Sequence, residues 1–288
     1  MIVKALRAAF IIIGLCAIIG CSSHSGKTQP GGAQSAVPGG DMLAEVRRRG
    51  TIVIATDANY SPQSFRAPDG TWSGFDVEVG KEIARRLGVK PEFKAEPFDV
   101  IVRGHWLDKW DISVGSMSIT SERTKVLWFT KPYYSVPGSI AVSQSSDITA
   151  LTDLKYKKIG VTTATTFESY LRGTLAGKMA VRPLDLQIVP YDNDIHALRD
   201  LARGHGRAID AVLTSLPTIQ TAIHDGLPIR IVGSPVFGDR PAIALDRSSA
   251  EEPLGLLFAI DGIVDAMHAD GTLRRLSEKY YGMDLSNG

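Results

Sequence analysis

Short apolar runs alternate with helical patterns along most of this chain. Residues 51–56 read TIVIAT, a β-branched run that predicts a buried strand. Val79, Ile83 and Leu87 then recur at helical spacing, and Gly88 follows as a stop signal. The same alternation predicts further strands at 111–115, 158–162, 208–213, 229–232 and 242–245, and helices at 41–49, 121–127, 166–175, 193–203, 217–225 and 251–269.

This alternation of strands and helices predicts an α/β fold built from open, mostly parallel sheets. Roughly 240 residues carry the pattern, more than one small sheet needs, so we expect two lobes with a ligand cleft between them. The alternation of strands and helices is interrupted at two places, first by Pro132, Pro137 and Gly138 and then by residues 233–241. These breaks predict a discontinuous first lobe at 41–134 plus 241–288, a second lobe at 138–237, and hinge crossings near 134–138 and 237–241.

The N-terminus has the layout of an export signal. Lys4 and Arg7 precede the apolar run AAFIIIGLCAIIG at 8–20, which is too short for a comfortable membrane span. The sequence AIIGC at 17–21 resembles the bacterial lipoprotein cleavage box. That resemblance implies a signal peptide at 1–20, cleavage before Cys21 and lipid attachment to its sulfur. An uncleaved signal anchor is the alternative.

The residues around this signal agree with an anchored, exported protein. Cys16 and Cys21 are the only cysteines, so cleavage and lipidation would leave no free thiol. Residues 22–40, rich in Ser, Gly and Pro, predict a flexible linker between the lipidated cysteine and the fold. We therefore expect lipid anchoring to the extracytoplasmic face of the membrane, at the cell surface or in the periplasm.

Composition and motifs argue against several other classes of function. The formal net charge is +1, which does not suggest nucleic-acid binding. The chain contains no G-x-S-x-G, P-loop or H-E-x-x-H motif, and its six histidines lack metal-ligand spacing. Asp192-Asn193-Asp194 faintly resembles a calcium loop, but a helix N-cap is the favoured interpretation. We expect no enzyme activity, no metal and no cofactor.

A series of collinear motifs between residues 41 and 282 resembles bacterial extracellular solute-binding proteins of family 3, which serve polar amino-acid ABC importers. The resemblance implies a two-lobed periplasmic-binding-protein fold of type II and a small zwitterionic ligand. It also implies an ABC permease and its ATPase as partners, and we expect a monomer. The motifs are GFDVEV at 74–79, WDISVGSMSITSER at 110–123, FTKPYY at 129–134, DLK at 153–155, IGV at 159–161, ATT at 164–166, DGTL at 270–273 and KYYG at 279–282.

Arg123 is the strongest candidate for holding a ligand carboxylate. It lies in the first turn of the predicted 121–127 helix, where a planar guanidinium, free N–H groups and the helix dipole would all favour an anion. The resemblance implies that Arg123 binds the ligand's α-carboxylate. It also implies that Ser116 and Ser118 contribute backbone or hydroxyl hydrogen bonds.

The resemblance adds candidates for the rest of the ligand. Tyr60 and Phe98 match two aromatic residues that sandwich the ligand side chain, although core packing is an alternative for Phe98. Asp57 matches a position that often reads the far end of a polar side chain. Thr162 and Thr166 match second-lobe positions near the ligand, with Thr166 helping to hold the carboxylate.

One difference from the family lies at the position expected to bind the ligand's amino group. The position at which the family usually has an Asp that binds the α-ammonium is Ser215 in this chain. A buried ammonium without a partner is costly, so another group must receive it or the ligand's cation is of a different kind. Glu168, Asp194 and Asp239 are candidates by rough position. Ala164, where the family often has Gly, is a smaller departure.

These observations predict a substrate-binding lipoprotein of an ABC importer. It would capture a polar amino acid or a derivative in the cleft between its lobes and deliver it to the permease. Two alternatives use the same fold. One is an enzyme similar to cyclohexadienyl dehydratase, and the other is the ligand-sensing lobe of a signalling system.

Overall fold

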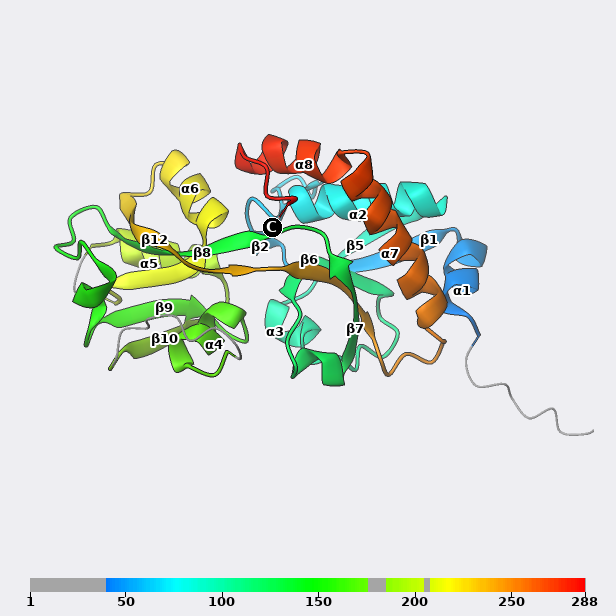
Figure 1. Ribbon diagram of the computed structural model, residues 1–288, viewed down its shortest axis with the longest axis horizontal. Helices are drawn as coiled ribbons and strands as arrows, with labels where there is room; N and C mark the ends of the chain where they lie inside the picture. The colour runs from blue at the N-terminus through cyan, green and yellow to red at the C-terminus, as the bar shows by residue number, and fades with distance from the viewer. Residues whose placement is uncertain (1–39, 176–184, 205–207, 288) are drawn as a thin grey trace, which may run out of the picture. The chain divides into compact units, whose positions relative to one another are not determined.

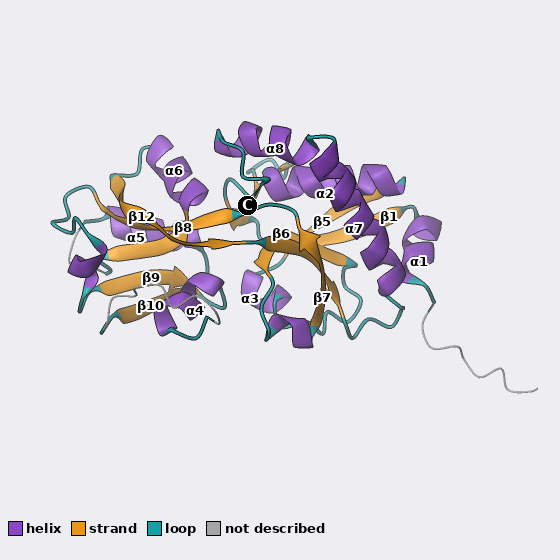
Figure 2. Ribbon diagram, viewed as in Figure 1, coloured by secondary structure: helices purple, strands orange, loops and turns teal. Residues whose placement is uncertain are grey.

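Every apolar run predicted as a strand contributes to one of two five-stranded sheets (Figures 1 and 2). The computed structural model describes residues 40–175, 185–204 and 208–287, all within one compact unit, Pro38–Gly288. The predicted signal peptide at 1–20, Cys21 and the linker up to residue 39 lie outside the described residues. None of the helices that the structure describes is both long enough and apolar enough to cross a membrane.

The first sheet has the strand order β5-β1-β6-β13-β7 and is covered on both faces. On one face, apolar residues of α1, α2, α7 and α8 share a core with β1, and on the other Ile101 of α3 packs with Trp106 and Trp110. A small sheet of β2 (Asn59–Tyr60), β3 (Ser64–Arg66) and β4 (Trp72–Ser73) lies between β1 and α2 in the chain. The main elements are α1 (Met42–Arg49), β1 (Thr51–Thr56), α2 (Phe75–Leu87), β5 (Lys90–Ala95), α3 (Phe98–Ile101), β6 (Ile112–Ser118), β7 (Leu127–Pro132), β13 (Pro241–Asp246), α7 (Leu254–Ala269) and α8 (Thr272–Tyr281).

The second sheet has the strand order β10-β9-β11-β8-β12. Residues of α4 pack into one core with this sheet, whereas those of α5 and α6 pack into another. Both sheets are therefore sandwiched by helices, as the alternating pattern predicts, and the chain has the two-lobed type II fold. The elements are β8 (Val136–Ser143), β9 (Lys158–Thr162), α4 (Thr166–Arg172), β10 (Gln187–Tyr191), α5 (Asp194–Ala202), β11 (Ala211–Ser215), α6 (Leu216–His224) and β12 (Ile229–Asp239), with a 3₁₀ turn at Leu151–Leu154.

The strands that run between the two sheets make both sheets mixed. In each sheet two of the four pairings are parallel and two are antiparallel, which corrects the expectation of mostly parallel sheets. The antiparallel pairings all involve β8, β12 or β13. The predicted break at 233–241 is smaller than expected because β12 continues to Asp239, where it pairs with Val136, and only Arg240 separates it from β13.

Helix ends follow the sequence signals closely, with one important exception. Gly88 ends α2 in the left-handed conformation, as predicted. The helix predicted at 121–127 is instead a 3₁₀ turn of three residues, Arg123–Lys125, because the buried Leu127 already begins strand β7. The prediction that a helix start adds free N–H groups and a dipole beside Arg123 is therefore wrong. The strand predicted at 208–213 also begins later, at Ala211, and runs on to Ser215.

Candidate functional site

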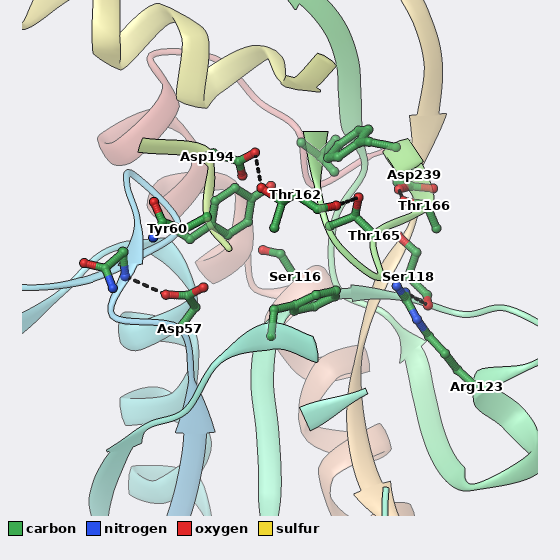
Figure 3. A pocket seen from close by; sticks show the side chains of 15 residues that line it. Asp57, Tyr60, Ser116, Ser118, Arg123, Thr162, Thr165, Thr166, Asp194 and Asp239 are labelled. Atoms are coloured by element: carbon green, nitrogen blue, oxygen red, sulfur yellow. Dashed lines mark hydrogen bonds between the residues drawn. The ribbon is translucent and has the colours of Figure 1, made fainter. Parts of the chain in front are cut away.

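A cavity lies where strands of both sheets end, with about 530 Å³ of empty volume that is partly open to solvent (Figure 3). A cleft at the carboxyl ends of strands is the usual ligand site in open α/β sheets. Eight of the nine predicted ligand-binding residues line it, and Ser215 does not. The eight are Asp57, Tyr60, Phe98, Ser116, Ser118, Arg123, Thr162 and Thr166, and they are joined by Asn59, Val136, Thr165, Phe167, Asn193, Asp194 and Asp239.

Arg123 enters the cavity as a buried guanidinium. Its residue surface is only 7% exposed, and its side chain lies over the Phe98 ring at 5.3 Å from the centroid. Nη1 donates to the Ser118 carbonyl at 2.7 Å, and Nη2 donates to the Ala164 carbonyl, on the second lobe, at 2.8 Å. Burial lowers the pKa of Arg123 to about 10, so the group stays protonated at neutral pH. A buried positive charge held by neutral carbonyls is well suited to receive an anion.

Two aromatic rings from the first lobe form apolar walls. Tyr60 follows β1, where the loop turns into the small sheet, and Phe98 begins the short helix α3. Both line the cavity, so Phe98 contributes to the site as well as packing against a core cluster. Burial raises the pKa of the Tyr60 hydroxyl well above its ordinary value, so this group is neutral.

Threonines dominate the wall from the second lobe. Thr165 caps α4 by accepting a hydrogen bond from the Glu168 N–H at 3.1 Å. The hydroxyl of the next residue, Thr166, donates to the Asp239 carboxylate, which comes from the end of β12. Asp239 in turn favours the charged form of Arg123 and so raises its pKa, a smaller effect than burial. The end of the cavity that holds Arg123 therefore combines a guanidinium, hydroxyls and one carboxylate.

Asp57 and Asp194 bring two further carboxyl groups into the cavity. Asp57 accepts from the Asn59 N–H at 2.7 Å, and burial raises its pKa. Asp194, 5% exposed, accepts from the Thr162 hydroxyl at 2.7 Å. Burial raises the pKa of Asp194 to about 6, and repulsion from Asp57 adds to this rise. Neither carboxylate has an ion pair with a cation among the residues that the structure describes.

Beneath the cavity, a buried carboxyl group holds Ser116 in place. Asp76 accepts hydrogen bonds from the Ser116 hydroxyl and the Tyr133 hydroxyl, both at 2.6 Å. The Ser116 N–H donates to the Tyr133 hydroxyl at 3.0 Å, which closes a ring of three residues. Burial raises the pKa of Asp76 to about 7. The sequence analysis placed Asp76 in the GFDVEV motif without giving it a role, and the structure shows it supporting a residue of the cavity wall.

Ser215 is used by the protein itself rather than by the cavity. It is fully buried and caps α6, accepting from the Thr218 N–H at 3.3 Å. Its hydroxyl also accepts from Gln63 Nε2 at 2.9 Å and donates to the Thr218 hydroxyl at 2.8 Å. Because Gln63 belongs to the first lobe, these bonds join the two lobes. Of the nine residues predicted to bind the ligand, Ser215 is the one that the structure places outside the cavity lining.

Of the three acidic residues considered as replacements for Ser215, the structure brings two into the cavity. Asp194 and Asp239 line it, whereas Glu168 pairs with Arg172 and accepts from the Ala164 N–H. Asp194 follows the N-cap of α5 and Asp239 ends β12, so rough position in the sequence was sufficient to find both. Ala164 has a left-handed φ of 63°, a conformation that a glycine would adopt more readily.

The residues 192–194 form a helix cap rather than a calcium loop. The Asn193 side chain accepts from the His196 N–H at 3.0 Å, as the favoured interpretation predicts. Among the described residues, no group of three or more His, Cys, Asp or Glu side chains could hold a metal ion.

Comparisons with known proteins agree with this architecture. The family model "Bacterial extracellular solute-binding proteins, family 3" matches residues 52–283. The chain is 28% identical over 248 residues to the L-cystine-binding protein TcyJ of Escherichia coli K12, covering 85% of this chain and 88% of that protein. It is 27% identical over 240 residues to an L-arginine-binding protein of Pseudomonas aeruginosa, covering 81% and 89%.

A solved structure extends the similarity to three dimensions. It is an ancestral amino acid-binding protein described as a precursor of cyclohexadienyl dehydratase. The two structures align with a TM-score of 0.71 at 29% identity, over 83% of this chain and 99% of the other.

Proposed function

This chain belongs to the bacterial extracellular solute-binding proteins of family 3, and from that premise we propose that its cavity captures a small zwitterionic solute for an ABC permease and its ATPase. The solute would be a polar amino acid or a derivative of one. As a member of an extracellular family, the protein binds its solute outside the cytoplasm. The relatives named above are binding proteins, and the proposal assigns no chemical step to the cavity.

One observation carries this proposal: a buried, protonated guanidinium faces a cavity that also holds two aromatic rings and carboxylates. Arg123 would bind the α-carboxylate through charge-assisted hydrogen bonds, supported by Ser118 and Thr166. Tyr60 and Phe98 would enclose the ligand side chain, and acidic groups would receive its amino group.

Capture would depend on closure of the two lobes around the ligand. We propose hinge crossings at 134–138 and 237–241, between a first lobe of 41–134 plus 241–288 and a second lobe of 138–237. Only two chain segments connect such lobes, so small backbone rotations there would open the cavity. The hydrogen bond from Arg123 to the Ala164 carbonyl and the bonds of Gln63 to Ser215 support this proposal because they join residues on opposite sides of these crossings.

A ligand screen tests the proposed function. At millimolar concentration, at least one polar amino acid is expected to raise the melting temperature of the purified protein, because a ligand that binds only the folded state stabilises it by mass action. Differential scanning fluorimetry with the common amino acids, betaines and opines measures the shift. If no amino acid or derivative shifts the transition, the proposed function is wrong.

We also propose that Cys21 carries a lipid that anchors the protein to the membrane. Replacing Cys21 with serine is expected to release the protein into the soluble fraction or leave a heavier unprocessed precursor, because a serine cannot accept the thioether-linked lipid. Fractionation and intact-mass measurement of cells expressing both forms check this. Recovery of wild-type protein without added lipid mass at Cys21 would contradict the anchor.

A further inference from the structure

The charged groups in the cavity are unequal in number. The lining residues include one guanidinium, Arg123, and three carboxyl groups, those of Asp57, Asp194 and Asp239. A ligand with one carboxylate and one ammonium adds no net charge, so it would leave this excess of negative charge in place. Charges in a partly enclosed cavity are screened less than in bulk water, so a ligand that carries an additional positive charge would compensate this excess better than a zwitterion.

The charges are also separated along the cavity. Figure 3 shows Arg123 with Ser118, Thr166 and Asp239 at one end, and Asp57 and Asp194 beside Tyr60 at the other. Electrostatic interactions follow the same division. Asp239 is the carboxylate that favours the charged form of Arg123, whereas at the other end Asp57 disfavours ionisation of Asp194. The cavity therefore has one end for an anion and one end with two carboxylates and no cation from the described residues.

The hydroxyl of Ser215 has no remaining capacity for a ligand ammonium. A serine hydroxyl can donate one hydrogen bond and accept two. Ser215 donates to the Thr218 hydroxyl and accepts from Gln63 and from the Thr218 N–H. Gln63 is itself held by a hydrogen bond from the Thr218 hydroxyl to its Oε1 at 3.1 Å. The hydroxyl at the position that the family resemblance assigns to the ammonium is thus used within the protein, by one bond from Gln63 of the first lobe and two bonds with Thr218 of α6.

We propose that Asp194 replaces position 215 as the receptor of the ligand's amino group, so that Asp57, already expected from the family resemblance to contact the far end of the ligand side chain, pairs with a second positive charge. This inference rests on the proposed function and narrows its solute to cationic α-amino acids. Asp194 is suited to the role because the Thr162 hydroxyl fixes one carboxylate oxygen at 2.7 Å. The rings of Tyr60 and Phe98 line the same cavity and favour a guanidinium or ammonium through cation–π attraction.

The test compares two ligands of nearly equal shape. L-Arginine and L-citrulline differ in that a ureido group replaces the guanidinium, so their affinities separate charge from size. The purified wild-type protein is expected to bind L-arginine at least about tenfold more tightly than L-citrulline in isothermal titration calorimetry, because only arginine pairs with a second carboxylate. Equal or tighter binding of L-citrulline or L-glutamine would overturn the charge assignment while leaving the proposed function intact.

Variants then separate the two carboxylates. Asp57→Asn is expected to reduce the preference for arginine over citrulline to below about threefold. Asp194→Asn is expected to weaken both ligands by at least about 30-fold, because both carry the α-ammonium. Ser215→Ala is the matched control and should weaken both by the same small factor, since it removes the α6 cap and the bond with Gln63 but no side chain of the cavity lining. If Ser215→Ala weakens binding as much as Asp194→Asn, position 215 is the receptor and the assignment is overturned.

The pH dependence supplies a readout that a purely structural role for Asp194 would not give. A ligand cation stabilises ionised Asp194, whose pKa burial raises to about 6 in the free protein. Arginine affinity should therefore be constant above this pH and fall as pH drops below it, by about tenfold per unit. Asp57 and Tyr60 are the titratable groups that interact with Asp194, and Tyr60 stays neutral over this range. The Asp57→Asn variant should retain this loss of arginine affinity at low pH, and the Asp194→Asn variant should not show it. A wild-type arginine affinity that stays constant between pH 7 and 5 would contradict the assignment of the amino group to Asp194.

Discussion

Replacing Arg123 with alanine is expected to weaken binding of every α-amino acid ligand by at least 100-fold, about 2.8 kcal/mol. The guanidinium is 7% exposed and already desolvated, so a ligand carboxylate gains strong hydrogen bonds without displacing bulk water from the arginine. Hydrogen bonds to a charged group contribute about 1.5–3 kcal/mol each, and a planar fork can make two. Calorimetry with the best ligand from the screen measures the loss.

A matched control separates the site effect from a general effect of losing an arginine. Arg85 lies on α2, its side chain is 69% exposed, and it pairs with Glu82 on the same helix. Arg85→Ala should leave affinity unchanged within twofold. If Arg123→Ala also stays within twofold of wild type while remaining folded, a guanidinium at position 123 is not the carboxylate receptor, and the account of the anion-binding end is wrong.

Replacing Phe75 with alanine is expected to lower the free energy of unfolding by about 3–5 kcal/mol, the usual cost of emptying a large buried aromatic site. Phe75 begins α2, is fully buried, and lies 4.9 Å from Tyr134 and 5.0 Å from Tyr281 between ring centroids. These rings pack beside Asp76 and Tyr133, which support the cavity wall. At this chain length the melting temperature should fall by roughly 6–20 °C, measured by circular dichroism.

Phe258 provides the corresponding control on the surface. It lies on α7 and is 68% exposed, so Phe258→Ala removes the same atoms without opening a cavity. Its effect on unfolding should stay within about 0.5 kcal/mol. A loss of less than 1 kcal/mol for Phe75→Ala would show that the aromatic cluster relaxes around the gap, and would argue against a rigid support beneath Ser116.

The contacts of Ser215 explain how the chain can carry a serine at a position where the family usually has an Asp without any change of fold. An Asp at this position would bring a charge beside the Gln63 amide, whereas the serine hydroxyl satisfies Gln63 and Thr218 together. The charge that position 215 lacks is found instead at Asp194, at the start of α5. The ligand-binding end of the cavity can therefore change without altering either sheet.

The local pattern of apolar and turn-forming residues was sufficient to predict most helices and strands. Strand β1 and strand β9 have the predicted bounds, because apolar β-branched runs of this length are buried in a sheet whatever their neighbours. Helix α2 ends at Leu87 before Gly88, since the glycine adopts a left-handed conformation at no steric cost. The family resemblance contributed eight residues of the cavity lining by position.

The same local pattern gave wrong predictions where contacts between distant segments outweigh the local preference for a helix or a strand. The segment 121–127 has helical character, but its last apolar residue pairs into the first sheet, and only a short 3₁₀ turn remains before it. The strand pairings that make both sheets mixed are likewise invisible in one dimension. They depend on which segments, far apart in the sequence, lie side by side in the folded chain.

The sequence by itself determined the α/β class, the two-lobed family and the residue types of the cavity, because hydrophobic periodicity and turn residues act over short distances. Only the tertiary structure decided which polar groups were still available to a ligand. In the sequence, Ser215 holds the position that the family resemblance assigns to the ammonium, and Asp194, 21 positions earlier, is one of three acidic candidates to replace it. In the fold, the Ser215 hydroxyl is saturated by its bonds with Gln63 and Thr218, and Asp194 is a buried carboxylate that lines the cavity.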